Sequence, residues 1–405
     1  MENSWKIYLL AVVSFLVGTS ENIIAGILDR VAEDVGVSIA AAGQLITVFS
    51  LAFAFGTPVV MAATAKVGRK KLMLGALGLF IVGNAIAVLS PNYTVLMVSR
   101  MILALGTGVF VVASLTVASK LAPAGKQGSA IATLVMGFST SLIVGVPLGR
   151  IIAASYDWKL IFAGIGLLSL LGVVAIARAI RETEGEAPVP FRSQLALLRS
   201  PRIALALSVT FFWIFGYSIM YTYISPFLLS ITGMSERAVS VGLFAFGIAS
   251  LIGSKLGGFS SDKWGIRRTL LGGMLLHAAV LLLLSVFSHS AAMMFPLLML
   301  WAFAAWSSGP TQQYYLLTLA QGASGIMLSL NSSMLQLAMA GGAGIGGAIV
   351  SGVSLWSISW LGALAVAAAA VLAAASFRIG REARWKAGET HAAALAAPQS
   401  DAASR

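Results

Sequence analysis

Long runs of apolar residues, separated by short polar breaks, occupy almost the whole chain. A helix that crosses a membrane needs about 20 mostly apolar residues, and the chain has twelve stretches of about this length. The breaks carry residues that favour turns, such as Pro91-Asn92. The pattern therefore predicts an all-α membrane protein with twelve transmembrane helices. They are expected at residues 7–28, 40–64, 72–90, 95–118, 129–154, 159–180, 203–228, 239–259, 269–288, 291–317, 326–350 and 356–378.

The longest polar break before the C-terminal tail, residues 182–190, divides the twelve predicted helices into two groups of six. A shift of 197 residues brings residues 56–75 over 253–272, where glycines and basic residues coincide. Duplicated halves of this kind are typical of transporters, which bind their substrate near the middle of the membrane between the halves. The predicted organisation is an N-terminal half at 1–180, a cytoplasmic linker at 181–202, a C-terminal half at 203–378 and a cytoplasmic, disordered tail at 379–405.

The distribution of charge predicts the orientation of the chain in the membrane. Only 10% of the residues are charged, whereas soluble proteins average about 25%. With the N-terminus in the cytoplasm, twenty of the 26 Lys and Arg residues fall on the cytoplasmic side. This asymmetry follows the positive-inside rule, so the net charge of +12 is explained by topology. We therefore expect both termini in the cytoplasm, contact with membrane lipid and no nucleic-acid partner.

The residues that catalysis and metal binding require are scarce in this chain. Cysteine is absent, which excludes disulfides, thiolate nucleophiles and Cys-based metal sites. The three histidines, His277, His289 and His391, are too far apart in sequence to suggest a metal cluster. We therefore expect no enzymatic activity, no metal and no cofactor. The driving force of transport would be the proton gradient.

A sequence rich in glycine and charge joins the second predicted span of each half to the third. It resembles the signature of the major facilitator superfamily, Gly-x-x-x-Asp-Arg/Lys-x-Gly-x-Arg/Lys. The second copy carries Gly258, Asp262, Lys263, Gly265, Arg267 and Arg268, and the first keeps Lys66, Gly68, Arg69 and Lys70 but has Met61 and Ala65 at the Gly and Asp positions. The resemblance implies the fold of that superfamily, with two six-helix halves around a central cavity, and we expect a monomer. It also implies that Asp262 helps to latch the halves in one state.

The fifth predicted span carries "GVPLG", in which Gly145, Pro147 and Gly149 are similar to a motif of exporters in the drug:proton antiporter branch of the superfamily. Small residues allow close helix packing, and proline introduces a kink. Within this branch, stretches such as "AGQLITVFSLAF" and "WSSGPTQQYYL" most resemble bacterial purine base and nucleoside efflux pumps. The resemblance implies efflux across the bacterial inner membrane. Export of drugs or other small metabolites is the alternative, while import and a transport-inactive receptor are disfavoured.

Glu21 is the one acidic residue of fourteen that lies deep inside a predicted span. An ionisable group in hydrocarbon is costly and usually faces a cavity or a partner. Eight residues separate Glu21 from Asp29, and eight separate Arg100 from Asn92, so both side chains lie roughly 12 Å inside the outer ends of their spans. This similar depth favours an ion pair, direct or through water, between Glu21 and Arg100.

The pair has two alternative roles. Burial favours the neutral form of a carboxyl and a nearby cation favours the charged form, so Glu21 beside Arg100 can carry the coupling proton. Alternatively, the two residues form a permanent ion pair that only fixes the geometry of their helices. The sequence leaves both roles open.

Polar and aromatic side chains inside the spans are candidates for substrate binding. A purine needs an aromatic face for stacking and amides that donate and accept hydrogen bonds. Trp306 with Gln312 or Gln313 in the tenth span supplies these groups, with hydrogen bonding between helices as the alternative role of the glutamines. The further candidates are Asn22, Asn331, Gln336 and, on one face of the seventh span, Trp213, Tyr217 and Tyr221.

Overall fold

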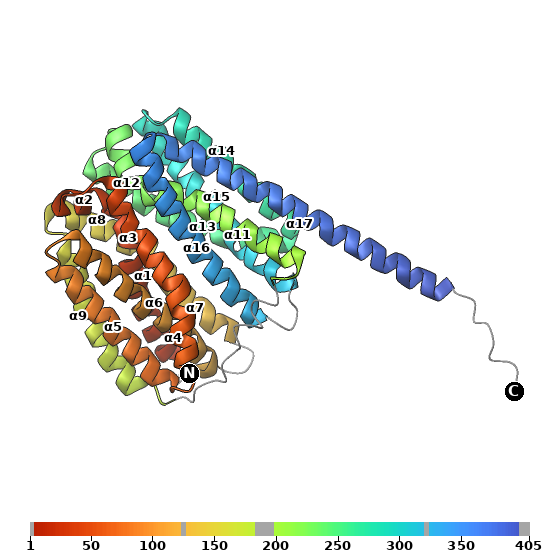
Figure 1. Ribbon diagram of the computed structural model, residues 1–405, viewed down its shortest axis with the longest axis horizontal. Coiled ribbons are helices and arrows are strands. Elements are labelled where there is room, and N and C mark those ends of the chain that lie inside the picture. Colours follow the sequence, from red (N-terminus) through yellow and green to blue (C-terminus); the bar gives the residue numbers. More distant parts are fainter. Residues whose placement is uncertain (1–3, 123–126, 183–197, 320–323, 397–405) are drawn as a thin grey trace, which may run out of the picture.

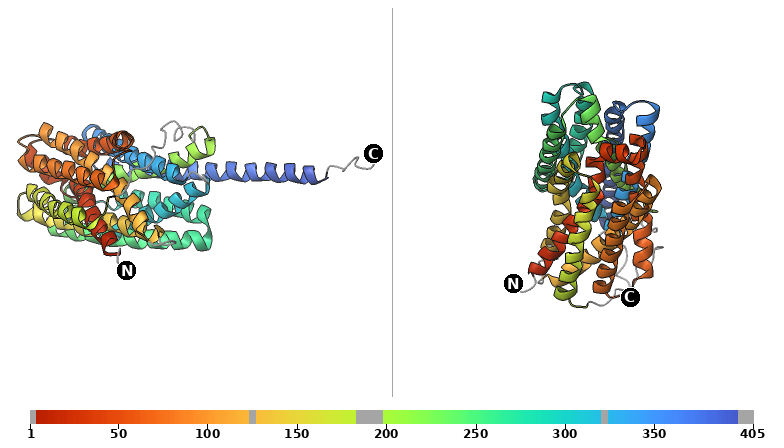
Figure 2. Two further views of the ribbon diagram at one scale, coloured as in Figure 1. Left: turned by 90° about the horizontal axis from the view of Figure 1, so that it is seen from below. Right: turned by 90° about the vertical axis from the view of Figure 1, so that its left-hand side faces the viewer.

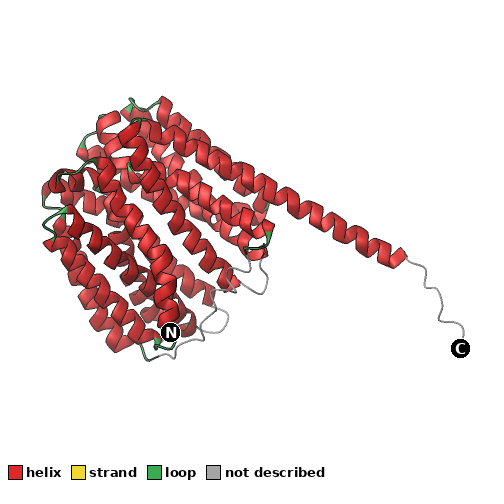
Figure 3. Ribbon diagram, in the orientation of Figure 1, coloured by secondary structure: helices red, strands yellow, loops and turns green. Residues whose placement is uncertain are grey.

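The computed structural model describes residues 4–122, 127–182, 198–319 and 324–396, and nearly all of them are helical (Figure 1, Figure 3). Twelve helices are long and apolar enough to cross a membrane. They cover Ser4–Gly26, Ile39–Ala63, Arg69–Leu89, Tyr93–Leu121, Thr133–Ser155, Lys159–Ala179, Pro201–Thr222, Glu236–Trp264, Ile266–Val286, Ala291–Leu319, Leu330–Gly352 and Ser357–Ile379. The predicted fold class and all twelve predicted spans are thereby confirmed, with ends that differ by a few residues.

The first six spans and their connections form one group of helices. Its elements are α1 (Ser4–Gly26), α2 (Leu28–Val35), α3 (Ile39–Leu51), η1 (Ala52–Gly56), α4 (Thr57–Ala63), α5 (Arg69–Leu89), α6 (Tyr93–Leu121), α7 (Gln127–Thr140), η2 (Ser141–Gly145), α8 (Val146–Ser155) and α9 (Lys159–Ala179).

The last six spans form a second group beside the first, drawn in green to blue in Figure 1. Its elements are α11 (Pro201–Thr222), α12 (Ile224–Pro226), η3 (Phe227–Ile231), α13 (Glu236–Trp264), α14 (Ile266–Val286), α15 (Ala291–Leu319), α16 (Ser324–Gly352) and α17 (Ser357–Ala396).

Polar side chains and glycines determine where several helices begin and end. The Asn92 side chain accepts a hydrogen bond from the Val95 backbone N–H at 3.0 Å and so caps the start of α6. Ser235 caps α13 in the same way. At the other end of α13, Gly265 has a φ of 83°, a left-handed conformation that glycine adopts without steric cost, and the chain turns there into α14.

Two prolines explain why the second and fifth spans are not regular helices. Pro58 and Pro147 lack the N–H that would bond to the carbonyl four residues earlier. Each lies directly after a π-helical turn, η1 or η2, in which the hydrogen bonds reach one residue further back. The kink predicted at Pro147 is therefore accompanied by a π-helical turn.

The glycines of the fifth span lie directly against α1. A methyl group built on Gly145 would lie 2.3 Å from the Thr19 hydroxyl oxygen, and one on Gly149 would lie 2.1 Å from the Ile23 side chain. Only glycine permits so close an approach at these two positions. Because Glu21 lies on the same stretch of α1, the glycines of the exporter-like motif set the position of its helix.

The two groups of helices meet mainly through α3 and η1 with α16, η2 and α8 with α13, and α12 with α1 and α2. The Gly43 backbone of α3 also packs on Tyr223, which lies between α11 and α12. We call the end of the bundle where α1 finishes the Asp29 end, and the opposite end, where α1 begins, the Ser4 end. The η2, α8, α12 and α2 contacts all belong to the half of the molecule nearer the Asp29 end (Figure 1).

The structure differs from the prediction for the tail. Residues from 379 onward were expected to be disordered, but α17 continues to Ala396 and projects beyond the bundle (Figure 2). The stretch "REARWKAGETHAAALA" is rich in Ala, Arg, Glu and Lys, the strongest helix formers, which explains the extension. The seventh span also ends earlier than expected, because the helix breaks at Tyr223 before α12. Most of the predicted linker, residues 183–197, lies outside the described residues, as do residues 397–405.

Candidate functional site

Glu21 of α1 contacts the second group of helices. Its Oε1 atom accepts a hydrogen bond of 3.2 Å from the side-chain amide of Gln336 on α16. Its Oε2 atom is buried and has no hydrogen-bond partner among the described residues. The carboxyl therefore joins the two halves of the molecule through one oxygen and leaves the other oxygen available.

Arg100 of α6 is fully buried beside the same stretch of α1. Its guanidinium donates to the backbone carbonyls of Ser20, at 2.8 Å, and Glu21, at 3.1 Å. Its carbon Cζ lies 4.3 Å from the centre of the Phe49 ring, a cation–π arrangement. The closeness of Arg100 to Glu21 predicted from their depth is confirmed.

The ion pair was predicted as direct or through water, and in the structure the two side chains form no direct one. Arg100 uses the second lone pairs of two helix carbonyls, which remain available after the hydrogen bonds of the helix are made. The carboxyl of Glu21 instead turns to Gln336. Arg100 thus holds the backbone of α1 and leaves the carboxyl of Glu21 free of that attachment.

Two hydrogen bonds fix the register of α11 against α16. Thr210 donates to the Asn331 side chain at 2.9 Å, and Ser218 donates to the Met339 carbonyl at 2.9 Å. Gln336 lies between these two levels on α16. It is therefore level with the part of α11 between residues 210 and 218, which carries two of the predicted aromatic candidates.

Those candidates, Trp213 and Tyr217, form an aromatic layer with Trp306 of α15. The Tyr217 and Trp306 rings meet edge to face, with centroids 6.2 Å apart. The Tyr217 hydroxyl and the Trp306 indole lie close enough to interact with each other, whereas the Trp213 indole nitrogen and the Gln336 carbonyl oxygen are buried without a hydrogen-bond partner among the described residues. Buried polar groups are nearly always hydrogen-bonded, so these two unsatisfied groups are suited to a polar ligand.

Tyr221 lies behind this layer. Its ring stacks on Tyr217 with centroids 5.0 Å apart and packs on Phe246. On the far side, Trp301 donates to the buried His277 ring at 2.9 Å, and the Trp301 ring lies 5.5 Å from that of Tyr217. These residues support the aromatic layer. Trp301 was not predicted, because a single tryptophan in an apolar span carries no signal of its own.

Other predicted candidates use their polar groups within the protein. Gln312 donates to the Ala206 carbonyl at 2.7 Å and to Thr210 at 3.0 Å, and Asn331 accepts from Thr210. Asn22 donates back to the Gly18 carbonyl at 2.9 Å. Gln313 is exposed. The structure thus brings Tyr217 and Trp306 into contact, places Trp213 beside Gly309 of α15 and Gln336 at the same level on α16, and uses Gln312 and Asn331 to fasten α15 and α16 to α11.

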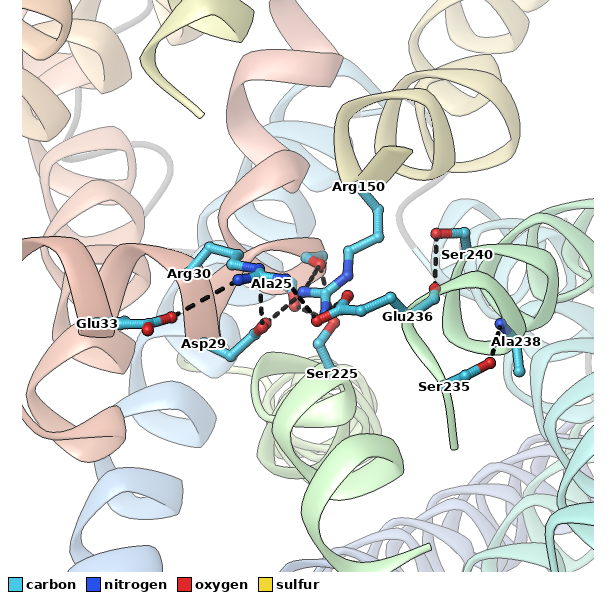
Figure 4. A network of polar contacts seen from close by, with 11 residues as sticks. Ala25, Asp29, Arg30, Glu33, Arg150, Ser225, Ser235, Glu236, Ala238 and Ser240 are labelled. Atoms are coloured by element: carbon cyan, nitrogen blue, oxygen red, sulfur yellow. Dashed lines mark hydrogen bonds and ion pairs between the residues drawn. The ribbon is translucent and has the colours of Figure 1, made fainter. Parts of the chain in front are cut away.

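A network of charged residues closes the Asp29 end (Figure 4). We call the cluster of Asp29, Arg30, Arg150 and Glu236 the latch. Arg150 of α8 is fully buried and forms ion pairs with both Asp29 and Glu236. Arg30 pairs with Glu236 at 2.8 Å. Because Glu236 begins α13 in the second group, the latch ties the two halves together.

A serine adds a neutral contact to the latch. Ser225 of α12 donates to the carbonyls of Ala25, at 3.1 Å, and Gly26, at 2.9 Å, where α1 ends. Sequence reasoning counted Arg150 only as an outer charge. A basic residue directly after the glycine motif, facing an acid at the end of the first span, is the signal that would have found it.

The signature loops lie at the Ser4 end. Asp262 is exposed and forms no ion pair in the part of the chain that the structure describes. Arg69 is buried at the start of α5, whereas Lys66 is exposed. The latch that the resemblance implies for Asp262 is thus open in this structure, and the ion pairs between the halves lie at the opposite end.

The comparisons with known proteins identify the family. The family model of the Major Facilitator Superfamily matches residues 10–343 and 223–400. The chain belongs to the major facilitator superfamily. It is 57% identical to the uncharacterised MFS-type transporter YbcL of Bacillus subtilis (strain 168), across 90% of this chain and 94% of that protein. It is 29% identical to the inner membrane transport protein YdhP of Escherichia coli (strain K12), across 93% and 97%.

Solved structures agree with this fold. A bacterial homologue of the human lysosomal transporter Spinster, in an inward-facing and occupied conformation, matches with a TM-score of 0.77 at 15% identity, over 93% of this chain and 97% of that one. The human organic anion transporter MFSD10 matches with a TM-score of 0.69 at 18% identity, over 92% and 99%. The chain is thus a multi-pass membrane transporter and not an enzyme.

Proposed function

We propose that the protein exports small molecules across the bacterial inner membrane in exchange for protons, with purine bases and nucleosides as the substrates. The Ser4 end faces the cytoplasm in this proposal, because it gathers most of the basic residues of the connections. The glycine motif against α1 supports export, since it resembles that of proton-driven exporters. With this orientation the latch closes the outer side.

The observation that carries the proposal is the contact between Glu21 and Gln336. A charged carboxylate accepts hydrogen bonds at both oxygens, whereas a protonated carboxyl donates through one of them. Protonation of Glu21 at its free Oε2 leaves Oε1 as the acceptor from Gln336 but turns a charge-assisted hydrogen bond to the opposite half of the molecule into a weaker neutral one. Arg100 keeps α1 in place during this change, because it holds the backbone. Proton binding is thereby coupled to the relative position of the halves.

The aromatic layer supports a planar, acceptor-rich substrate. Trp306 and Tyr217 offer ring faces for stacking, and the indole N–H of Trp213 is a donor without a partner among the described residues. A purine presents ring nitrogens, and hypoxanthine also an exocyclic oxygen, as acceptors for such a donor. Its own N–H groups can donate to the free oxygens of Glu21 and Gln336. A substrate bound to Glu21 in this way competes with the proton, as exchange requires.

Transport into inverted membrane vesicles tests this function. With an imposed proton gradient, vesicles that contain the protein are expected to accumulate radiolabelled hypoxanthine or adenosine, and Glu21→Gln is expected to abolish that accumulation. Glu182→Gln, which neutralises an exposed carboxyl, serves as the matched control and is expected to transport normally.

Two outcomes would contradict the proposal. Accumulation of a lipophilic dye without any purine would replace the substrate assignment by multidrug export, a function that the aromatic layer also suits. Full gradient-driven transport by the Glu21→Gln variant would show that the proton binds elsewhere.

A further inference from the structure

A basic pocket opens on the side of the molecule at the Ser4 end, away from the central site. It lies where α1 begins and α9 ends and has a volume of about 510 Å³. Its lining consists of Trp5, Lys6, Ala175, Arg178, Ala179 and Arg181. No residue of the proposed transport site or of the latch contributes to it.

The charge of this pocket is entirely positive. Three of its six lining residues are cations, and none is acidic. In the described part of the chain, neither Lys6 nor Arg178 forms an ion pair with a carboxylate. The pocket therefore suits an anion, and a phosphate group matches two converging cations well.

Two stripes of exposed apolar side chains run from the pocket along the membrane-facing surface. On α1, Trp5 is followed by Tyr8 and Val12, at helical spacing, and all three are more than half exposed. On α9, Leu171 and Val174 precede Arg178 on one face and are likewise exposed. The two helices pack directly on each other, since a methyl group on Gly172 would lie 3.0 Å from Val13.

We propose that this pocket and its apolar stripes bind an anionic phospholipid from the leaflet at the Ser4 end. Lys6 and Arg178 hold the phosphate, and Trp5 lies at the level of the headgroup, where tryptophan is enriched in membrane proteins. The acyl chains follow the stripes of α1 and α9. Basic pockets at the ends of membrane helices suit such headgroups. A soluble phosphate compound would use the cations but not the stripes.

Native mass spectrometry of the delipidated full-length protein tests this site. Phosphatidylglycerol is expected to bind the wild type and phosphatidylcholine is not. The double variant Lys6→Gln/Arg178→Gln is expected to bind phosphatidylglycerol about thirtyfold more weakly, equivalent to about 2 kcal/mol for the loss of two cations. The matched control is Arg199→Gln/Arg202→Gln, which removes two cations at the same end of the molecule but outside the pocket.

The same measurement distinguishes two alternatives, binding of a soluble phosphate compound and non-specific attraction of the lipid by charge. If phosphatidylglycerol binding were weakened equally in the pocket variant and the control, the overall charge of the protein would attract the lipid, and the proposal would be overturned. Displacement of phosphatidylglycerol by an equal concentration of glycerol phosphate would show that the stripes contribute nothing, and would overturn it as well. Trp5→Ala is expected to weaken phosphatidylglycerol binding several-fold. A monodisperse peak in gel filtration shows for each variant that the protein is folded.

Discussion

At the scale of single residues, Arg100 is the side chain that holds the backbone of α1 at Ser20 and Glu21. Lysine in its place can reach only one of the two carbonyls on α1 and cannot cover the Phe49 ring with a planar cation. A lost hydrogen bond from a charged group costs about 2 kcal/mol. We therefore expect Arg100→Lys to lower the melting temperature, measured by intrinsic tryptophan fluorescence, and to reduce proton-driven transport at least tenfold.

The matched control is Arg237→Lys, since Arg237 is exposed and has no hydrogen bond in the described part of the chain. It is expected to leave both the melting temperature and transport unchanged. An Arg100→Lys variant as stable and as active as the wild type would contradict the role assigned to the two carbonyl contacts.

The residues of the central site could be predicted from the sequence only in part. Glu21 was identifiable because it is the single acid deep in a span, and its nearness to Arg100 followed from counting residues from two loops. The partners of the two side chains could not be predicted. Whether a guanidinium bonds to a carboxylate or to the carbonyls beside it depends on rotation by a fraction of a helical turn, which depth does not determine. The Glu21–Gln336 contact likewise depends on the register between α1 and α16.

At the scale of helices, the contact of η2 with α1 depends on glycine. A side chain on Gly145 would collide with Thr19, whereas Gly164 of α9 is exposed, with no atom within 4 Å of an added methyl group. Overpacking of a close contact costs about 1–3 kcal/mol. Gly145→Leu is expected to lower the melting temperature and the transport rate, and Gly164→Leu is expected to leave both unchanged. Equal effects of the two variants would show that the close contact is not needed.

The sequence predicted helices better than their irregularities. Twelve apolar runs predict twelve spans because the length of a run alone is sufficient. The π-helical turns η1 and η2 have no such signal beyond the prolines that follow them. The tail was judged by its small polar residues, although its alanines and alternating charges stabilise the helix that continues α17 to Ala396.

At the scale of the whole molecule, ion pairs join the two halves at the Asp29 end. The latch ties α2 and α8 to α13 at the Asp29 end, while Asp262 at the Ser4 end lacks an ion-pair partner among the described residues. Alternating access requires that the closed end can open, so the latch is one of the contacts that must break, together with that of Ser225. The resemblance implied a contact between the halves at the signature loops instead. A sequence motif identifies residues that can make such a contact, but it does not determine in which conformation of the transporter they make it.

Weakening the latch therefore shifts the molecule toward the state that opens at the Asp29 end. Glu236→Gln removes the carboxylate that joins Arg150 and Arg30 across the halves, while Arg150 keeps its ion pair with Asp29. Loss of a charged hydrogen bond costs about 2 kcal/mol, which shifts a two-state equilibrium roughly thirtyfold. Since the chain has no cysteine, Tyr156→Cys and Val353→Cys can carry two spin labels, one on each half at the Asp29 end. Pulsed electron paramagnetic resonance is expected to show a longer distance between the two labels with Glu236→Gln.

The control variant is Glu33→Gln. It removes only an exposed partner of Arg30 at 3.7 Å, a type of pair worth at most about 1 kcal/mol, and is expected to leave the distance between the labels unchanged. An unchanged distance in both variants would mean that other contacts, such as that of Ser225 with the end of α1, hold the halves together.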